Sequence, residues 1–170
     1  MDIDIIIPIY NAFDFVKKCI ETVIEHTDLT QHTLLLVNDK STDERILPLL
    51  NSFIKENQSL NIILIDNKDN QGFVRTVNIG MQYSHHDVVL LNSDTEVTRN
   101  WLSKIQNCAY SKPAVATVTP LSNNATLASV PVFLAENTIP PGLSVEEYAD
   151  IVEKCSMNLF PDIPTAHGFC

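Results

Sequence analysis

Four apolar segments of the chain each end in a short run of oxygen-bearing side chains. The clearest is residues 88–91, which lead directly into Asn92, Ser93 and Asp94; the other three segments are residues 5–11, 34–39 and 62–67. Short apolar runs bounded by polar residues are typical of buried strands. In open α/β sheets, ligands bind just beyond the carboxyl ends of the strands. These four polar ends are therefore the candidate binding residues.

Asp94 is the strongest candidate for chemistry. Mg²⁺ or Mn²⁺ binds one or two carboxylates together with phosphate oxygens of a substrate, and it neutralises both a bound diphosphate and the charge that builds as the diphosphate leaves. Asn92 lies two residues earlier, so an extended backbone directs both side chains the same way. The alternative interpretation is that Asn92–Thr95 is merely a turn that caps the next helix.

A second carboxylate, Asp39, follows the strand predicted at 33–38. A fixed acceptor at this position suits the imide N–H of uracil or thymine, or the edge of guanine. Pro8, Ile9 and Tyr10 end the first strand, where the proline shapes the exit of the chain. For the Tyr10 ring, both stacking on a base and ordinary packing stay open.

The segment between the third strand and the next helix contains Asp66, Asn70 and Gly72. Gly72 permits a positive φ or a close backbone approach, and amides at a helix N-terminus attract anions. Arg75 is either a phosphate contact or a solvated surface residue. Gly80, inside the predicted helix, indicates close packing against a neighbouring element, because glycine in a helix costs about 1 kcal/mol relative to alanine.

Strand and helix patterns alternate from residue 2 to about residue 120, which predicts a mostly parallel sheet with helices on both faces, a three-layer α/β/α fold. The first predicted helix begins near Phe13. Four more are predicted at residues 41–54, 73–83, 101–110 and 145–155. In the second, Ser41 and Glu44 resemble a capping box, or Pro48 starts the regular helix. Thr98 is the expected cap of the fourth. Further strands are expected at 114–119 and 165–170.

We expect one domain over residues 1–170. Its parts are a nucleotide-binding core at 1–120, a long proline-containing loop or lid at 121–143, and a helix with an incomplete strand at 144–170. In the helix at 73–83, Val74, Val77 and Met81 are expected to face inward.

Composition restricts the partners and the compartment. The net charge of −10 and a pI near 4.7 argue against a nucleic-acid partner, which requires clustered Lys and Arg. The four cysteines are widely spaced, which is typical of reduced thiols in the cytoplasm. We expect neither a signal peptide nor a membrane span, because the N-terminus opens directly into a predicted strand and no apolar stretch reaches about 18 residues. Peripheral association with the inner face of the membrane stays open. We predict solvated positions for His26, His32, His85 and His86, and place His167 in the terminal strand without a role.

Four motifs, in this order, resemble the family 2 glycosyltransferases with a GT-A fold: Pro8-Ile9-Tyr10-Asn11, Val37-Asn38-Asp39-Lys40-Ser41-Thr42-Asp43, Asn70-Gln71-Gly72-Phe73 and Leu90-Leu91-Asn92-Ser93-Asp94-Thr95-Glu96-Val97. The resemblance covers nearly the whole chain. Residues 117–126 and 162–170 also look like a bacterial subgroup associated with surface-polysaccharide synthesis and rhamnosyl-type transfer.

The resemblance implies sugar transfer with inversion from a nucleotide-diphospho-sugar, with UDP- or dTDP-sugars favoured, to a glycan or lipid-linked acceptor. It places the base at Asp39 and at residues 8–10, and Mn²⁺ or Mg²⁺ at Asp94. Asn92 replaces the first carboxylate of the usual Asp-x-Asp. Because the family's acidic pair would follow Cys170, we expect a donor-binding part truncated at the C-terminus, without the general base that transfer needs.

Two other classes compete with this hypothesis. A non-catalytic nucleotide-sugar-binding module would have the same donor site. A nucleotidyltransferase would have a Gly- and Lys/Arg-rich loop after the first strand, where residues 11–14 are Asn-Ala-Phe-Asp. A Rossmann dehydrogenase is disfavoured because no GxGxxG motif follows any strand.

Overall fold

The computed structural model describes residues 1–125 and 127–166. It contains two compact units: the first is Met1–Val97, and the second begins at Thr98. All the binding residues predicted from the sequence belong to the first unit. The subdivision at residues 120 and 143 stays a prediction.

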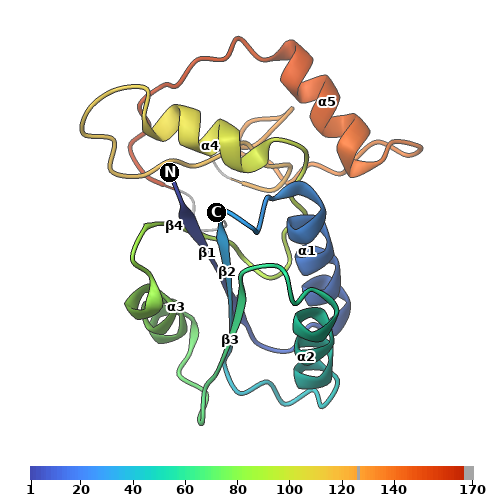
Figure 1. Cartoon of the computed structure of the whole chain (residues 1–170). Helices are drawn as coiled ribbons and strands as arrows, with labels where there is room; N and C mark the ends of the chain where they lie inside the picture. The colour runs from blue at the N-terminus through green and yellow to red at the C-terminus, as the bar shows by residue number, and fades with distance from the viewer. Residues whose placement is uncertain (126, 167–170) are drawn as a thin grey trace. The chain divides into compact units, whose positions relative to one another are not determined.

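The first unit is a parallel four-stranded sheet of order β3-β2-β1-β4. Its strands are β1 (Ile3–Ile9), β2 (Thr33–Asn38), β3 (Ile62–Asp66) and β4 (Asp87–Leu90). The connecting helices are α1 (Phe13–His26), α2 (Ile46–Glu56) and α3 (Phe73–Tyr83). Figure 1 shows α1 and α2 on one face of the sheet and α3 on the other. The predicted three-layer α/β/α arrangement is confirmed.

The strand order reverses beside β1. The chain moves outward from β1 through β2 to β3, and α3 then returns it to β4 on the other side of β1. The connection from β1 through α1 to β2 and the connection from β3 through α3 to β4 therefore lie on opposite faces of the sheet. Such a switch point is where open α/β sheets bind ligands.

The core is centred on β1, all seven residues of which are buried. A strand covered by helices on both faces has no solvated side, which is why Ile5, Ile6 and Ile7 follow one another in the sequence. Gly80 of α3 packs closely on this strand, as predicted. A Cβ added at Gly80 would lie 2.6 Å from Cγ2 of Ile6.

Helix α2 begins later than the capping-box pattern predicts. Its N-cap is Arg45, which makes no capping hydrogen bond through its side chain. The Ser41 hydroxyl instead accepts a hydrogen bond from the backbone amide of Asn11, at 2.9 Å. Pro48 lies in the first turn, where a missing N–H removes no intrahelical hydrogen bond.

Two expectations about burial are wrong. Val74 and Met81 of α3 are 68% and 38% exposed, because the face of α3 that packs on the sheet consists of Thr76, Val77 and Gly80. The predicted solvated position of His32 is also wrong. His32 is buried, and its Nδ1 accepts a hydrogen bond from the amide of Ile3, at 3.2 Å.

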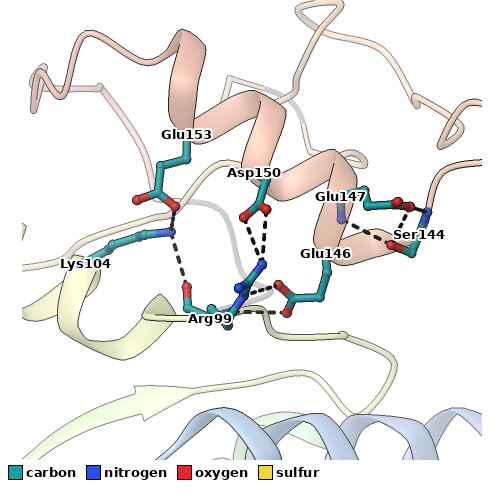
Figure 2. Close-up of polar contacts among 7 residues, drawn as sticks. All are labelled: Arg99, Lys104, Ser144, Glu146, Glu147, Asp150 and Glu153. Atoms are coloured by element: carbon teal, nitrogen blue, oxygen red, sulfur yellow. Dashed lines mark hydrogen bonds and ion pairs between the residues drawn. The ribbon is translucent and has the colours of Figure 1, made fainter.

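The second unit contains α4 (Trp101–Ala109) and α5 (Val145–Cys155). A capping box starts α5, in which Ser144 accepts from the amide of Glu147 and the Glu147 carboxylate accepts from the amide of Ser144 (Figure 2). Arg99 donates to Glu146 and Asp150, and Lys104 donates to Glu153 at 2.7 Å. These ion pairs join the start of α4 to one side of α5.

Two other predictions for the second unit are wrong, and a third lies mostly outside the described residues. Residues 114–119 form no strand, since none of the described segments pairs with them in a ladder. Thr98 is not the cap of α4; the N-cap is Asn100, without a side-chain hydrogen bond. In the predicted terminal strand, residues 165–166 are irregular, and 167–170, including His167, lie outside the described residues. In the described part of the chain, no helix has both the length and the apolar composition of a membrane span.

Candidate functional site

The polar strand ends meet at one edge of the sheet of the first unit. The register pairs Ile9 of β1 with Asn38 of β2, and Ile6 of β1 with Leu90 of β4. Beyond the strands, the amide of Asp39 donates to the carbonyl of Ile9 at 2.8 Å, and the amide of Leu91 donates to the carbonyl of Ile6 at 2.9 Å. Asp39 and the segment that contains Asp94 therefore lie on either side of β1, at the carboxyl edge.

Asp94 lies in a turn that follows β4. The amide of Thr95 donates to the carbonyl of Asn92 at 3.2 Å, so the backbone is not extended here, and the expected parallel direction of Asn92 and Asp94 does not follow. The turn does not cap α4, whose N-cap is Asn100. The Asp94 side chain is exposed and has no hydrogen-bond or ion-pair partner among the described residues. Its carboxylate is available to a ligand.

Helix α1 holds both ends of this turn segment. The thiol of Cys19 lies 3.5 Å from the carbonyl oxygen of Asn92. One turn later along the helix, the hydroxyl of Thr22 accepts a hydrogen bond from the amide of Val97 at 3.2 Å. Both Cys19 and Thr22 are buried. Asp94 is thus an exposed carboxylate on a segment that is attached to a packed helix on both sides.

Asp39 is only 4% exposed, and both of its carboxylate oxygens accept hydrogen bonds. Oδ1 accepts from the side-chain amide of Asn67 at 2.9 Å and from the backbone amide of Gln71 at 2.7 Å. Oδ2 accepts from the backbone amide of Gly72, the N-cap of α3, at 2.8 Å. The carboxylate therefore holds the 67–72 loop and faces the positive end of a helix dipole.

These contacts decide the protonation state of Asp39. Burial opposes the charged form, but the hydrogen bonds from Gln71, Asn67, Thr76 and Gly72 together outweigh it and hold the pKa of Asp39 below its ordinary value. Asp39 is accordingly an anion at neutral pH. Its predicted contact with a base stays a prediction, since the observed contacts are with the protein's own loop.

The loops after β1 and β2 are joined by Asn11. Its side-chain oxygen accepts hydrogen bonds from the amides of Thr42 and Asp43, at 2.8 and 2.9 Å. Asn11 and Ala12 both have left-handed backbone conformations, with φ of 59° and 56°. Asparagine is among the residues that adopt this region most readily. Asn11 therefore closes the turn after β1 and fixes the start of the next loop.

The remaining predicted site residues differ in the solvent exposure and the hydrogen bonds of their side chains. Pro8 and Ile9 are buried, so their side chains belong to the core, whereas the ring of Tyr10 is 49% exposed. Asp66 accepts a hydrogen bond from the side-chain amide of Asn38 at 2.7 Å. Asn70 donates to the carbonyl of Asp39 at 3.2 Å. Asp66 and Asn70 thus connect the ends of neighbouring strands.

Sequence reasoning missed two residues that position the site, Cys19 and Thr22 of α1. It marked Asn11 and Asn67 only as polar strand ends, without a positioning role. Each of the four acts through one hydrogen bond or more to a loop distant in sequence. The local signal for Asn11 and Asn67 is an asparagine at the end of a predicted strand segment.

The donor set suits a metal ion that is shared with a substrate. The described residues contain no group of three or more His, Cys, Asp or Glu that would form a closed metal site. Mg²⁺ in phosphate-binding enzymes is held by one or two carboxylates plus phosphate oxygens and water. Asp94, exposed and unpartnered, fits that pattern, with Asn92 and Ser93 nearby in the chain.

Comparison with known proteins bears on the family of the chain. The model of the family described as glycosyl transferase family 2 matches residues 4–167. The chain is 31% identical over 104 residues to polypeptide N-acetylgalactosaminyltransferase 11 of Xenopus tropicalis, which is 59% of this chain and 17% of that protein. The chain spans between 11% and 31% of the curated relatives that it matches.

Solved structures share the fold. A mannosyltransferase from Pyrobaculum calidifontis, in complex with GDP-Man and Mn²⁺, matches with a TM-score of 0.65 and 17% identity, over 71% of this chain and 35% of that one. S. aureus TarS (residues 1–349), in complex with UDP-GlcNAc, matches with a TM-score of 0.56 and 15% identity, over 74% of this chain and 39% of that one. The α/β fold is that of the GT-A glycosyltransferases, and the chain belongs to glycosyl transferase family 2.

Proposed function

We propose that this chain binds the nucleotide-diphospho-sugar donor of a glycosyltransferase that transfers a hexosyl or rhamnosyl-type sugar, with inversion, to a glycan or lipid-linked acceptor. UDP- or dTDP-sugars are the favoured donors. Asp94 holds Mn²⁺ or Mg²⁺. The nucleobase of the donor binds at Asp39 and at residues 8–10, the end of β1 with Tyr10. We also propose a cytoplasmic location, at the inner face of the membrane if the acceptor is lipid-linked.

One observation carries this proposal. Asp94 is an exposed carboxylate without a partner among residues 1–125 and 127–166, and it stands at the switch point of a parallel sheet. The contacts of α1 with Asn92 and Val97 fix both ends of its segment. When bound, a divalent cation supplies positive charge for the diphosphate, which a chain with a net charge of −10 needs.

The choice of nucleobase in the proposed donor rests on the sequence resemblance. The two structural relatives were solved with a guanosine and a uridine donor. Uracil, thymine and guanine share ring carbonyl acceptors and an N–H donor. We favour UDP or dTDP from the four-motif resemblance.

Calorimetric titration with UDP, dTDP, GDP and ADP, each with and without Mn²⁺, tests the proposal. We expect Mn²⁺-dependent binding that Asp94→Ala abolishes and Asp94→Asn weakens strongly, because both variants lose the charged ligand. The matched control is Glu25→Ala, which removes an exposed carboxylate from α1, and it should bind like the wild type. Wild-type affinity in Asp94→Ala would refute the metal assignment.

A further inference from the structure

Lys40, directly after Asp39, has a left-handed backbone with a φ of 57°. In this region the Cβ of an L-residue crowds the backbone, so glycine adopts it freely and lysine seldom does. Strained positions of this kind are concentrated at ligand-binding sites. A glycine would adopt this backbone without strain, so the lysine at this position suggests a role for its side chain.

The backbone on both sides of Lys40 is fixed by four hydrogen bonds, three of which reach residues distant in sequence. Before it, the Asp39 amide donates to the carbonyl of Ile9, and the Asp39 carbonyl accepts from Asn70. After it, the amide of Ser41 donates to Asn38 Oδ1 at 3.2 Å, and the hydroxyl of Ser41 accepts from the amide of Asn11. Lys40 is thus the projecting residue of a tightly held turn.

The ammonium of Lys40 has no partner among the described residues. Its side chain is exposed, and no described residue forms an ion pair or hydrogen bond with its ammonium. The adjacent carboxylate of Asp39 is already occupied by the 67–72 loop. By contrast, Arg45, a few residues later, pairs with Asp43 at 2.7 Å.

The sheet order places Lys40 and Asp94 on opposite sides of β1. Lys40 follows β2, which lies on the side of β1 opposite to β4 and Asp94. Neighbouring strands are about 4.8 Å apart, so β2 and β4 are separated by about 10 Å. With the diphosphate at Asp94, as proposed above, a nucleoside that extends across the end of β1, past Tyr10, reaches the side of the sheet on which Lys40 lies.

We propose that Lys40 is a donor-binding residue whose ammonium donates a hydrogen bond to a ring carbonyl oxygen of the nucleobase. The inference rests on the proposed function and adds a basis for choosing the base. Uracil, thymine and guanine carry such an oxygen, whereas adenine carries an amino group at the corresponding edge.

Titration of two variants tests this assignment. Lys40→Gly removes the ammonium and the backbone strain, and Lys40→Met removes the ammonium but keeps the strain and most of the length. Both should raise the Kd of the preferred nucleoside diphosphate about tenfold, as expected for the loss of one hydrogen bond from a charged donor. Lys40→Gly should also raise the Tm, so that stability and affinity change in opposite directions.

Two control variants separate strain and charge from binding. Ala12 is exposed and has a similar φ of 56°, so Ala12→Gly relieves comparable strain without removing a functional group. It should raise the Tm and leave the Kd unchanged. Lys18→Ala removes an exposed cation from α1 and should leave the Kd unchanged. If the Kd rises in Lys40→Gly but stays at the wild-type value in Lys40→Met, the loss of affinity is due to backbone flexibility and the assignment is overturned.

ADP distinguishes a base contact from a phosphate contact. If Lys40 binds a base carbonyl, both Lys40 variants lose affinity for the preferred diphosphate but not for ADP. An equal loss for both nucleotides would mean a phosphate contact and overturn the assignment. Wild-type affinity in both variants would overturn it too, while Mn²⁺-dependent binding would still support the proposed function. A wild-type protein that binds no nucleoside diphosphate would refute the proposed function itself.

Discussion

The carboxylate of Asp39, at the end of β2, accepts a hydrogen bond from the backbone amide of Gly72, at the start of α3, over 2.8 Å. Gly72 has a φ of 77°, which a side chain would strain, and no atom would crowd a Cβ there. The glycine therefore permits, without strain, the backbone conformation in which the amides of Gln71 and Gly72 donate to Asp39. The contact orients the loop between β3 and α3 at the proposed donor site.

We predict that Asp39→Asn destabilises the first unit by about 1–3 kcal/mol, since a buried amide or carboxamide hydrogen loses its acceptor. Chemical denaturation measures the change. Asp69→Asn removes the same charge from the 67–72 loop that Asp39 holds, where the Asp69 side chain accepts no hydrogen bond from a described residue, and should change stability by less than about 0.5 kcal/mol. Equal stability of the two variants would show that the Asp39 contacts contribute little.

Thr22→Val should weaken metal-dependent nucleotide binding without touching the ligand. The valine leaves the amide of Val97 without its acceptor, at a cost of about 1–3 kcal/mol, and frees one end of the Asp94 segment. We expect a larger loss of affinity for UDP with Mn²⁺ than without it. Thr22→Ser retains the hydroxyl and should restore the wild-type difference. If Thr22→Ser behaves like Thr22→Val, packing of the methyl group is responsible instead.

His32 should make the first unit sensitive to mild acid. Burial lowers the pKa of His32 below its ordinary value of 6.5, against the opposing effect of Asp2 and Asp28. The unfolded chain therefore binds a proton at a higher pH than the folded one, and stability falls as the pH drops below about 6.5.

Urea midpoints between pH 7.5 and pH 5 measure the effect of His32. In His32→Asn the amide oxygen can still accept from Ile3 but does not titrate, so the slope with pH should be smaller. A slope equal to that of the wild type would assign the acid sensitivity to another group.

Gly80→Ala should destabilise the fold by about 1–3 kcal/mol through overpacking. The new Cβ would lie 2.6 Å from the Cγ2 atom of the buried residue Ile6, which cannot move away freely. Thermal denaturation measures the loss, with Asn78→Ala on the exposed side of the same helix as the control. An unchanged Tm in Gly80→Ala would mean that α3 shifts away from the sheet without cost.

Much of the fold follows from local pattern. Consecutive apolar residues such as Ile5–Ile7 and Leu34–Leu36 can be buried on both faces only in a covered parallel sheet, and the intervening helices have apolar stripes. The same runs mark where each strand ends, so the sequence by itself determined that Tyr10, Asp39 and Asp94 follow strands and that Asp66 lies at a strand end. It also determined the close packing at Gly80, because a glycine in a helix requires a compensating contact.

Tertiary structure decided the rest, because it depends on partners that are far away in the chain. The turn at Asp94 is set by Cys19 and Thr22, more than 70 residues earlier in the chain. The buried position of His32 is set by its hydrogen bond from the amide of Ile3, at the start of β1. The predicted strand at 114–119 failed for the same reason: an extended apolar segment becomes a strand only where a neighbour offers hydrogen bonds, and no local pattern records that neighbour.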